Sequence, residues 1–164
     1  TAAARTYPLP AVFVDGGGAE VRPAGGASSA ASYTNAAEAE AAARVASLLV
    51  DHAGFAPSQL AILTFFDAQR VLLEAALAAR AESGGGASLA GVRVAVVDAD
   101  LLGCEVDIAI LSCVRAGAAG AAAAGAGGGL GALSDGHRIC VALSRAREGL
   151  VVVGSARCLN AERQ

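Results

Sequence analysis

Two arginines with helical spacing are the first residues whose type and position suggest chemistry. Arg138 and Arg145 lie seven residues apart in a stretch, residues 135–148, that is predicted to be a helix. Seven residues make two helical turns, so both side chains would lie on one face. A guanidinium is planar, keeps its charge and binds phosphate through paired donors. The stretch therefore predicts two rigidly held phosphate-binding side chains, and the alternative is an exposed helix with scattered arginines.

A second stretch, residues 60–69, places polar side chains where an apolar run ends. It is predicted to begin as the strand Leu60–Phe66 and to continue as a helix from Asp67. Thr64 lies at the end of the strand and Gln69 opens the helix, where backbone amides and side chains can hold a phosphate. The alternative is a strand edge followed by a capped helix.

Continuous Val, Ile and Leu runs alternate with helical patterns along the chain. The predicted strands are Ala11–Val14, Leu60–Phe66, Val92–Val97, Ile108–Cys113 and Leu150–Val153. The predicted helices run from Asn35 to before Gly54, from Asp67 to about Ala81 and from about Asp135 to Glu148, and a short helical segment follows the last strand. Asn35, with Glu38 three residues later, is predicted to cap the first helix. We therefore predict an α/β fold, a doubly wound and mainly parallel sheet with helices on both faces. Its ligands would lie beyond the carboxyl ends of the strands.

Length and composition fit one compact domain over residues 1–164, with 55% hydrophobic residues. An Ala/Gly stretch at about 116–132 has no apolar periodicity and is predicted to be a disordered insertion. The formal net charge is -3, and all 12 basic residues are arginine. A broad basic surface for nucleic acid is therefore excluded, and any such binding must be local.

Membrane, export and metal signals are missing from the sequence. No strongly apolar run is long enough to span a bilayer, and the first residues lack the pattern of a secretory signal. We therefore expect a soluble protein, and the missing initiator Met suggests a fragment. The cysteines never form Cys-x-x-Cys and are predicted to be small buried hydrophobes, not metal ligands; they are Cys104, Cys113, Cys140 and Cys158.

Residues 134–147, SDGHRICVALSRAR, resemble motif VI of the Upf-type superfamily 1 helicases. The family pattern reads Asp-x-Arg-Arg-x-Asn-Val-Ala-Leu-Thr-Arg-Ala-Arg, followed by Gly and an apolar strand. Arg145 matches the arginine finger, which in the family reaches the γ-phosphate of a nucleotide bound by a neighbouring domain, so the resemblance implies a catalytic role. Arg138 would support that site. His137 and Cys140 replace the family's first arginine and its asparagine.

Residues 96–115, VVDADLLGCEVDIAILSCVR, resemble motif V of the same family. The family pattern is Thr-Val-Asp-x-x-Gln-Gly-x-Glu-x-Asp, then an apolar strand and Ser-x-Val-Arg. The matching positions are Gly103, Glu105, Asp107, Ser112, Val114 and Arg115. Leu102 departs from the pattern. The resemblance implies that Gly103 and Glu105 help to bind the nucleotide, with the glutamate as an acceptor for the ribose. Without the match, Glu105 would be a solvated turn carboxylate.

Two further segments extend the resemblance over about Ala11 to Leu159. Residues 60–69, LAILTFFDAQ, are similar to Ile-x-Thr-Pro-Tyr-x-x-Gln, and residues 32–39, SYTNAAEA, are similar to Ser-Tyr-x-Asn-x-x-Glu-Ala. Ala36 replaces an arginine that assists at the γ-phosphate in some members. The resemblance implies a nucleic-acid-binding role for Thr64, Gln69, Arg115 and Ser144.

The resemblance implies that the chain is the second RecA-like motor domain of an ATP-dependent RNA or DNA helicase. ATP with Mg²⁺ would be held mainly by the N-terminal RecA-like domain of the same protein, which supplies the phosphate-loop lysine. This chain contains no lysine, so it would be inactive alone. Its expected partners are that domain and single-stranded RNA or DNA, in the cytoplasm or the nucleus.

Two other readings remain open. The departures at Leu102, Ala36, His137 and Cys140 permit a degenerate helicase-like binding or scaffold module without ATP turnover. A small-molecule enzyme on a doubly wound sheet is also possible, because two acidic residues at a strand end, Asp98 and Asp100, could bind a ribose. No Gly-x-Gly-x-x-Gly turn supports that second reading.

Overall fold

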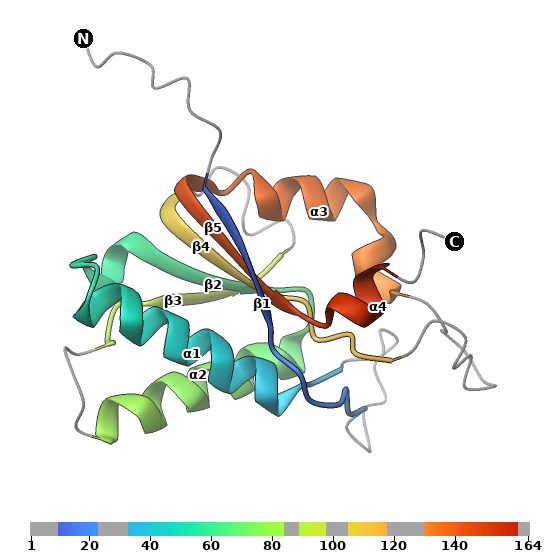
Figure 1. The fold of residues 1–164 in the computed structure, drawn as a ribbon, viewed down its shortest axis with the longest axis horizontal. Coiled ribbons are helices and arrows are strands. Elements are labelled where there is room, and N and C mark those ends of the chain that lie inside the picture. Colours follow the sequence, from blue (N-terminus) through green and yellow to red (C-terminus); the bar gives the residue numbers. More distant parts are fainter. Residues whose placement is uncertain (1–9, 23–32, 84–88, 98–104, 118–129, 161–164) are drawn as a thin grey trace, which may run out of the picture.

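A parallel sheet forms the centre of the domain (Figure 1). The computed structural model describes residues 10–22, 33–83, 89–97, 105–117 and 130–160. In these ranges the strands are β1 (Ala11–Asp15), β2 (Leu60–Thr64), β3 (Arg93–Val96), β4 (Val106–Ser112) and β5 (Ala146–Gly154). They are arranged in the order β1-β5-β4-β2-β3, and every neighbouring pair is parallel. The predicted α/β fold class is confirmed.

Helices cover both faces of the sheet. They are α1 (Ala36–Asp51), α2 (Asp67–Glu82), α3 (Gly136–Leu143) and α4 (Ala156–Asn160). Two short 3-10 helices span Pro57–Gln59 and Gly131–Ser134. Helices α1 and α2 lie together on one face, while α3 crosses the other (Figure 1). The arrangement agrees with the predicted doubly wound architecture.

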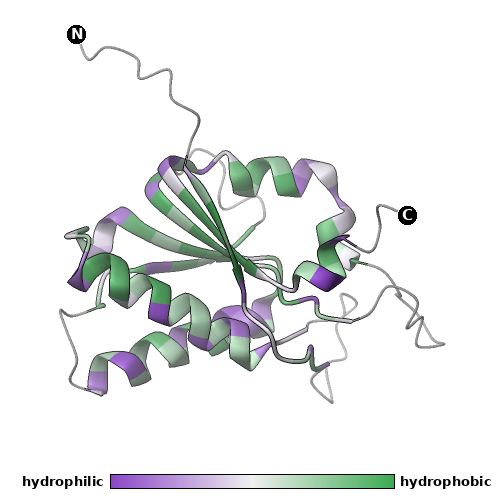
Figure 2. Cartoon of the chain, viewed as in Figure 1, coloured by the Kyte–Doolittle hydropathy of each residue, from purple (hydrophilic) through white to green (hydrophobic). Residues whose placement is uncertain are grey.

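Each face of the sheet has its own hydrophobic cluster. Ala42, Leu73 and Ile110 are fully buried between the sheet and the α1/α2 layer. Leu111 and Ala142 belong to the cluster beneath α3. Figure 2 shows that the central strands are mostly hydrophobic, whereas hydrophobic and hydrophilic residues alternate along the helices. Alanines on α1 let that helix approach the sheet closely, which explains how an alanine-rich chain builds a core.

Helix α3 is shorter, and β5 longer, than predicted. The helix was expected to continue to Glu148, but it ends at Leu143. In its last turn the Ser144 hydroxyl donates to the Val141 carbonyl at 3.1 Å. The Arg145 amide donates three residues back at 3.3 Å. Such contacts tighten and end a helix.

The strand then begins at Ala146, because this residue pairs with Val106 at the start of β4. Arg147 and Glu148 in this part of β5 are polar, so the apolar run that predicts the strand begins only at Leu150. The prediction that Arg138 and Arg145 share one face of one helix is therefore wrong. Arg138 lies in the first turn of α3, and Arg145 lies in the turn between α3 and β5.

Several other predictions are corrected or fall outside the described residues. Strand β2 ends at Thr64, not Phe66, because α2 begins at Asp67. Asp98, Asp100, Gly103 and most of the insertion at 116–132 lie outside the described residues. In the parts that are described, no helix has the length and apolar character needed to cross a membrane.

Two neighbouring positions on α2 test the packing of this layer. Leu73 is fully buried, whereas Val71 is 57% exposed. Leu73→Ala should lower the free energy of unfolding by about 2–5 kcal/mol, because it leaves a cavity against the sheet. Val71→Ala should change it by no more than about 0.5 kcal/mol. Urea denaturation of both variants measures the difference, and equal losses would contradict this packing.

Candidate functional site

The predicted site residues lie at opposite edges of the sheet. Thr64, Gln69 and Arg115 are at the carboxyl ends of the strands, where Arg138 also begins α3. Glu105, Ser144 and Arg145 are at the amino ends of β4 and β5. The structure therefore divides the predicted residues into two groups. Ser144 lies apart from the other residues predicted to bind nucleic acid, and Arg138 lies apart from Arg145.

At the carboxyl edge, Gln69 joins the starts of the two helices on the same face. Its side-chain oxygen accepts from the Asn35 amide at 2.8 Å, and its nitrogen donates to the Asn35 carbonyl at 3.0 Å. The same nitrogen donates to the Ser112 hydroxyl at 3.2 Å. All three residues are fully buried, so this amide fixes α1, α2 and the end of β4 relative to one another.

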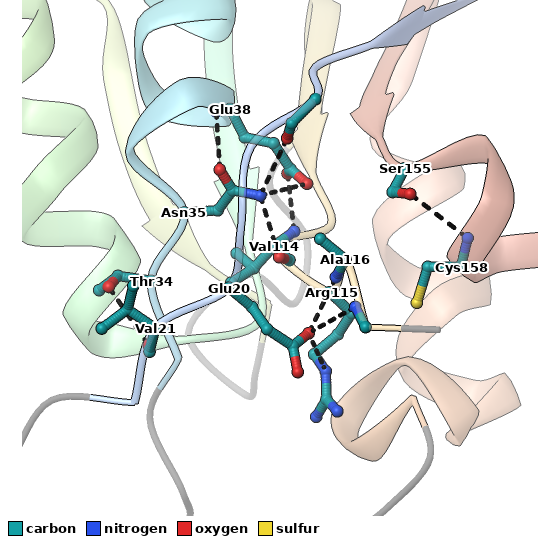
Figure 3. Close-up of polar contacts among 12 residues, drawn as sticks. Glu20, Val21, Thr34, Asn35, Glu38, Val114, Arg115, Ala116, Ser155 and Cys158 are labelled. Atoms are coloured by element: carbon teal, nitrogen blue, oxygen red, sulfur yellow. Dashed lines mark hydrogen bonds and ion pairs between the residues drawn. The ribbon is translucent and has the colours of Figure 1, made fainter. Parts of the chain in front are cut away.

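A buried carboxylate, Glu38, lies next to Asn35 (Figure 3). Its Oε2 accepts from the Ser112 hydroxyl at 3.0 Å and from the Val114 amide at 2.7 Å. The Asn35 side chain caps α1 by accepting from the Glu38 amide at 3.2 Å, and its own amide nitrogen donates to Glu38 Oε1 at 3.3 Å. The predicted cap is confirmed, and it forms part of a larger network.

This network holds an unusual turn after β4. Val114 has φ of 70° and is the one non-glycine residue with positive φ in the described ranges. The Arg115 amide donates to the Cys113 carbonyl at 2.8 Å across it, which makes a γ-turn. A β-branched residue in this conformation is strained. The bonds from Val114 to Glu38 and Asn35 therefore have to compensate the strain.

The turn directs Arg115 onto an aromatic side chain and a second carboxylate. Its guanidinium carbon lies 4.3 Å from the centroid of the Tyr33 ring, and Tyr33 packs edge to face on Phe66 at 5.8 Å. Its Nε donates to Glu20 Oε2 at 2.9 Å (Figure 3). The guanidinium is thereby held between an aromatic ring and a carboxylate.

Thr64 and Gln69 do not form the surface of this edge. Both are fully buried, and the Thr64 hydroxyl has no hydrogen-bond partner among the described residues. Sequence reasoning placed them as direct contacts to a bound strand. Their side chains instead support the edge from within, so a contact with nucleic acid would involve the backbone that they position.

Arg138 ties α3 to the end of β3. Its Nε and one terminal nitrogen donate to the Val97 carbonyl at 3.1 and 2.6 Å. Its guanidinium carbon lies 5.7 Å from the centroid of the Phe65 ring. Asp135 caps the helix by accepting from two amides of its first turn. Arg138 therefore positions the exit of β3, from which the motif V segment continues.

Arg145 is half-buried at the amino edge, and its guanidinium is oriented by its own turn. Its Nε donates to the Val141 carbonyl at 3.0 Å, and a terminal nitrogen donates to the Ser144 hydroxyl at 3.0 Å. Its carbonyl accepts from the Val106 amide at 2.9 Å. The residue is thus anchored to α3 on one side and to β4 on the other.

Glu105 lies directly beside this turn. Its carboxylate accepts from Arg147 Nε at 2.8 Å, and both side chains are exposed. Exposed pairs of this kind add little stability, so their value lies in the charges they present. The amino edge thus places the Glu105 carboxylate against Arg147, two residues after Arg145.

Comparison with known proteins identifies the family. The sequence profile of a family described as an AAA domain matches residues 3–157. The chain belongs to this family. It is 33% identical over 150 residues to the regulator of nonsense transcripts 1 of Caenorhabditis elegans, covering 92% of this chain and 13% of that protein. A Schizosaccharomyces pombe helicase required for RNAi-mediated heterochromatin assembly is 35% identical over 127 residues, 77% of this chain and 11% of that protein.

The resemblance to Upf-type superfamily 1 helicases is thereby confirmed for this AAA domain, including its RecA-like fold. The human NFX1-type zinc finger-containing protein 1 is 38% identical over 105 residues, which cover 64% of this chain and 5% of that protein. The chain therefore spans only a small part of the relatives it matches.

Sequence reasoning missed the buried network of the AAA domain and one cysteine. Asn35 and Glu38 were read as a helix cap and a family pattern, and Glu20 was not singled out. The sequence feature that could have revealed the network is the spacing of polar residues before and inside an alanine-rich helix. Cys140 is exposed, contrary to prediction, whereas Cys113 and Cys158 are buried as predicted. Within the described ranges, no cluster of His, Cys, Asp or Glu could hold a metal ion.

Burial raises the pKa of Glu38 from 4.5 to about 7, because desolvation outweighs the hydrogen bonds from Val114 and Ser112. The folded domain therefore binds the proton more tightly than the unfolded chain. The stabilisation that comes from protonated Glu38 is fully present below about pH 4.5 and is lost as the pH rises through about 7. The free energy of unfolding should fall by up to about 3 kcal/mol across this window.

Glu38→Gln removes the titrating group, so this fall should be absent from the variant. Urea denaturation across the same pH window measures the slope. The control is Glu74→Gln, which alters an exposed glutamate paired with Arg70 on α2 and should keep the wild-type slope. A Glu38→Gln variant with an unchanged slope would assign the pH dependence to another group.

Proposed function

We propose that this AAA domain is the second motor domain of an ATP-dependent helicase acting on RNA or DNA. ATP and Mg²⁺ are held mainly by a first RecA-like domain, and this domain completes the site. The family match and the similarity to a protein named as a helicase support the proposal. The cytoplasm or nucleus remains the predicted location.

The position of Arg145 carries the proposal. A finger must reach a phosphate on another domain, so it has to be accessible and held in a defined direction. Arg145 is partly buried in a turn, and the Val141 carbonyl fixes the plane of its guanidinium. Glu105 lies at the same edge, where it would accept from a ribose hydroxyl. The first domain would therefore approach the amino ends of β4 and β5, opposite to the carboxyl ends at which the sequence analysis predicted ligands.

The opposite edge would carry the single strand. Arg115 supplies a fixed charge there, and the amides of Ala116 and Gly117 follow the turn at Val114, with Glu20 as their acceptor in the absence of a strand. Thr64 and Gln69 contribute by holding this edge in place. Placing the nucleotide and the strand at different edges lets closure of the interdomain cleft move one relative to the other.

Arg145→Ala should lower strand-stimulated ATP hydrolysis of the full-length protein by about 10³-fold or more, because charge on the transferring phosphoryl group loses its counter-charge. Arg145→Lys should recover little, since an ammonium lacks the Nε donor that orients the side chain. The rate is measured by phosphate release with and without single-stranded RNA.

Arg44→Ala provides the control, because Arg44 is exposed on α1, away from both edges. It should keep hydrolysis within about twofold of wild type. Equal rates for Arg145→Ala and Arg44→Ala would exclude the finger role.

The departures at Ala36 and His137 favour one alternative, a helicase-like binding module without turnover. An upstream domain with an intact phosphate-loop lysine and Mg²⁺-binding carboxylates would favour the motor. Their absence, together with strand binding unaffected by ATP, would favour the binding module.

A further inference from the structure

One carboxylate oxygen at the carboxyl edge receives three donors. Glu20 Oε2 accepts from Arg115 Nε at 2.9 Å, from the Ala116 amide at 2.8 Å and from the Gly117 amide at 3.3 Å (Figure 3). Consecutive amides that converge with a guanidinium on one oxygen form an anion-binding concavity. The donors are those that a phosphate oxygen requires.

The guanidinium, and the turn that leads into the two amides, are held in place by groups other than Glu20. Arg115 lies on the Tyr33 ring, and its amide closes the γ-turn at Val114. That turn is fixed by Glu38 from beneath. Removing Glu20 would therefore leave the guanidinium and the preceding turn in place, which favours an anion because less further ordering is needed.

Glu20 itself enters from the solvent side. Its side chain is 21% exposed, while that of Arg115 is 8% exposed. It lies on the segment after β1, which is held by main-chain bonds between Val21 and Thr34 at 2.7 and 2.8 Å. An anion arriving from solvent would compete directly with this carboxylate.

We propose that Arg115 and the amides of Ala116 and Gly117 form a phosphate-binding site that Glu20 fills as an internal phosphate mimic. Assignment of the incoming phosphate to a nucleic-acid backbone rests on the proposed function. The site itself is independent of that function. Because a phosphate must displace Glu20, isolated phosphates bind weakly. A strand that supplies several contacts at once is favoured.

Thermal unfolding of the 164-residue chain in inorganic phosphate, compared with chloride at equal ionic strength, tests the site. Glu20→Gln leaves Arg115 without its counter-charge, and phosphate should raise the Tm of this variant by about 5 °C more than that of wild type. Glu40→Gln removes the same charge and serves as the control. Glu40 lies on the exposed side of α1 and is also ion-paired, with Arg80 of α2. This control should respond as wild type does.

Glu20→Asp covers the case in which the glutamine variant does not fold. It keeps the charge but shortens the reach to Arg115, so it should show a smaller phosphate response of the same sign. If neither variant responds more than Glu40→Gln, the site is overturned. That result would leave the Arg145 experiment, and the motor function, untouched.

Binding of a fluorescein-labelled oligouridine, followed by anisotropy, identifies the source of the phosphate. Glu20→Gln should bind about tenfold more tightly than Glu40→Gln, and adding Arg115→Ala should abolish the gain. A phosphate response without tighter oligouridine binding supports the site but assigns it to free phosphate. Equal tightening in both glutamine variants would reflect net charge alone and would overturn the strand assignment.

Discussion

A buried carboxylate and a strained turn stabilise each other at the carboxyl edge of this AAA domain. Glu38 is costly to bury and Val114 is costly to hold at positive φ. The turn supplies an amide donor to the carboxylate, and the carboxylate supplies the acceptor that the turn needs. Asn35 and Gln69 extend the bonding to the starts of α1 and α2. The exit of β4, and therefore Arg115, is fixed by groups that do not reach solvent.

Helix α3 connects this edge to the opposite one. Arg138 in its first turn is bonded to the carbonyl of Val97 after β3, and Arg145 beyond its last turn is bonded to Val106 in β4. The helix has eight residues, and Ala142 is fully buried against the sheet. A packed element of this size moves as a unit. A displacement of Arg145 would therefore shift α3 as a whole and move Arg138 at the end of β3.

The sequence predicted the sheet well because its strands are short apolar runs, and it predicted α1 because Asn35 and Glu38 form a local cap. It failed at the α3/β5 boundary, where Ala146 to Glu148 are neither apolar nor periodic and join the sheet by pairing with β4. The network was hidden for a different reason. Apart from the Asn35–Glu38 cap, the partners described above are 34 to 79 residues apart in the chain, so only the fold reveals that these polar side chains are buried together.

The exclusive use of arginine has a structural consequence at both edges. Arg115, Arg138 and Arg145 each donate through Nε, to a carboxylate in the first case and to a main-chain carbonyl in the other two. This bond fixes the plane of the guanidinium and so determines where the terminal nitrogens point. A lysine has one nitrogen, which can satisfy a local acceptor or reach outward, and its charge is lost more easily on burial. Half-buried positions that must both anchor and present a charge therefore require the guanidinium.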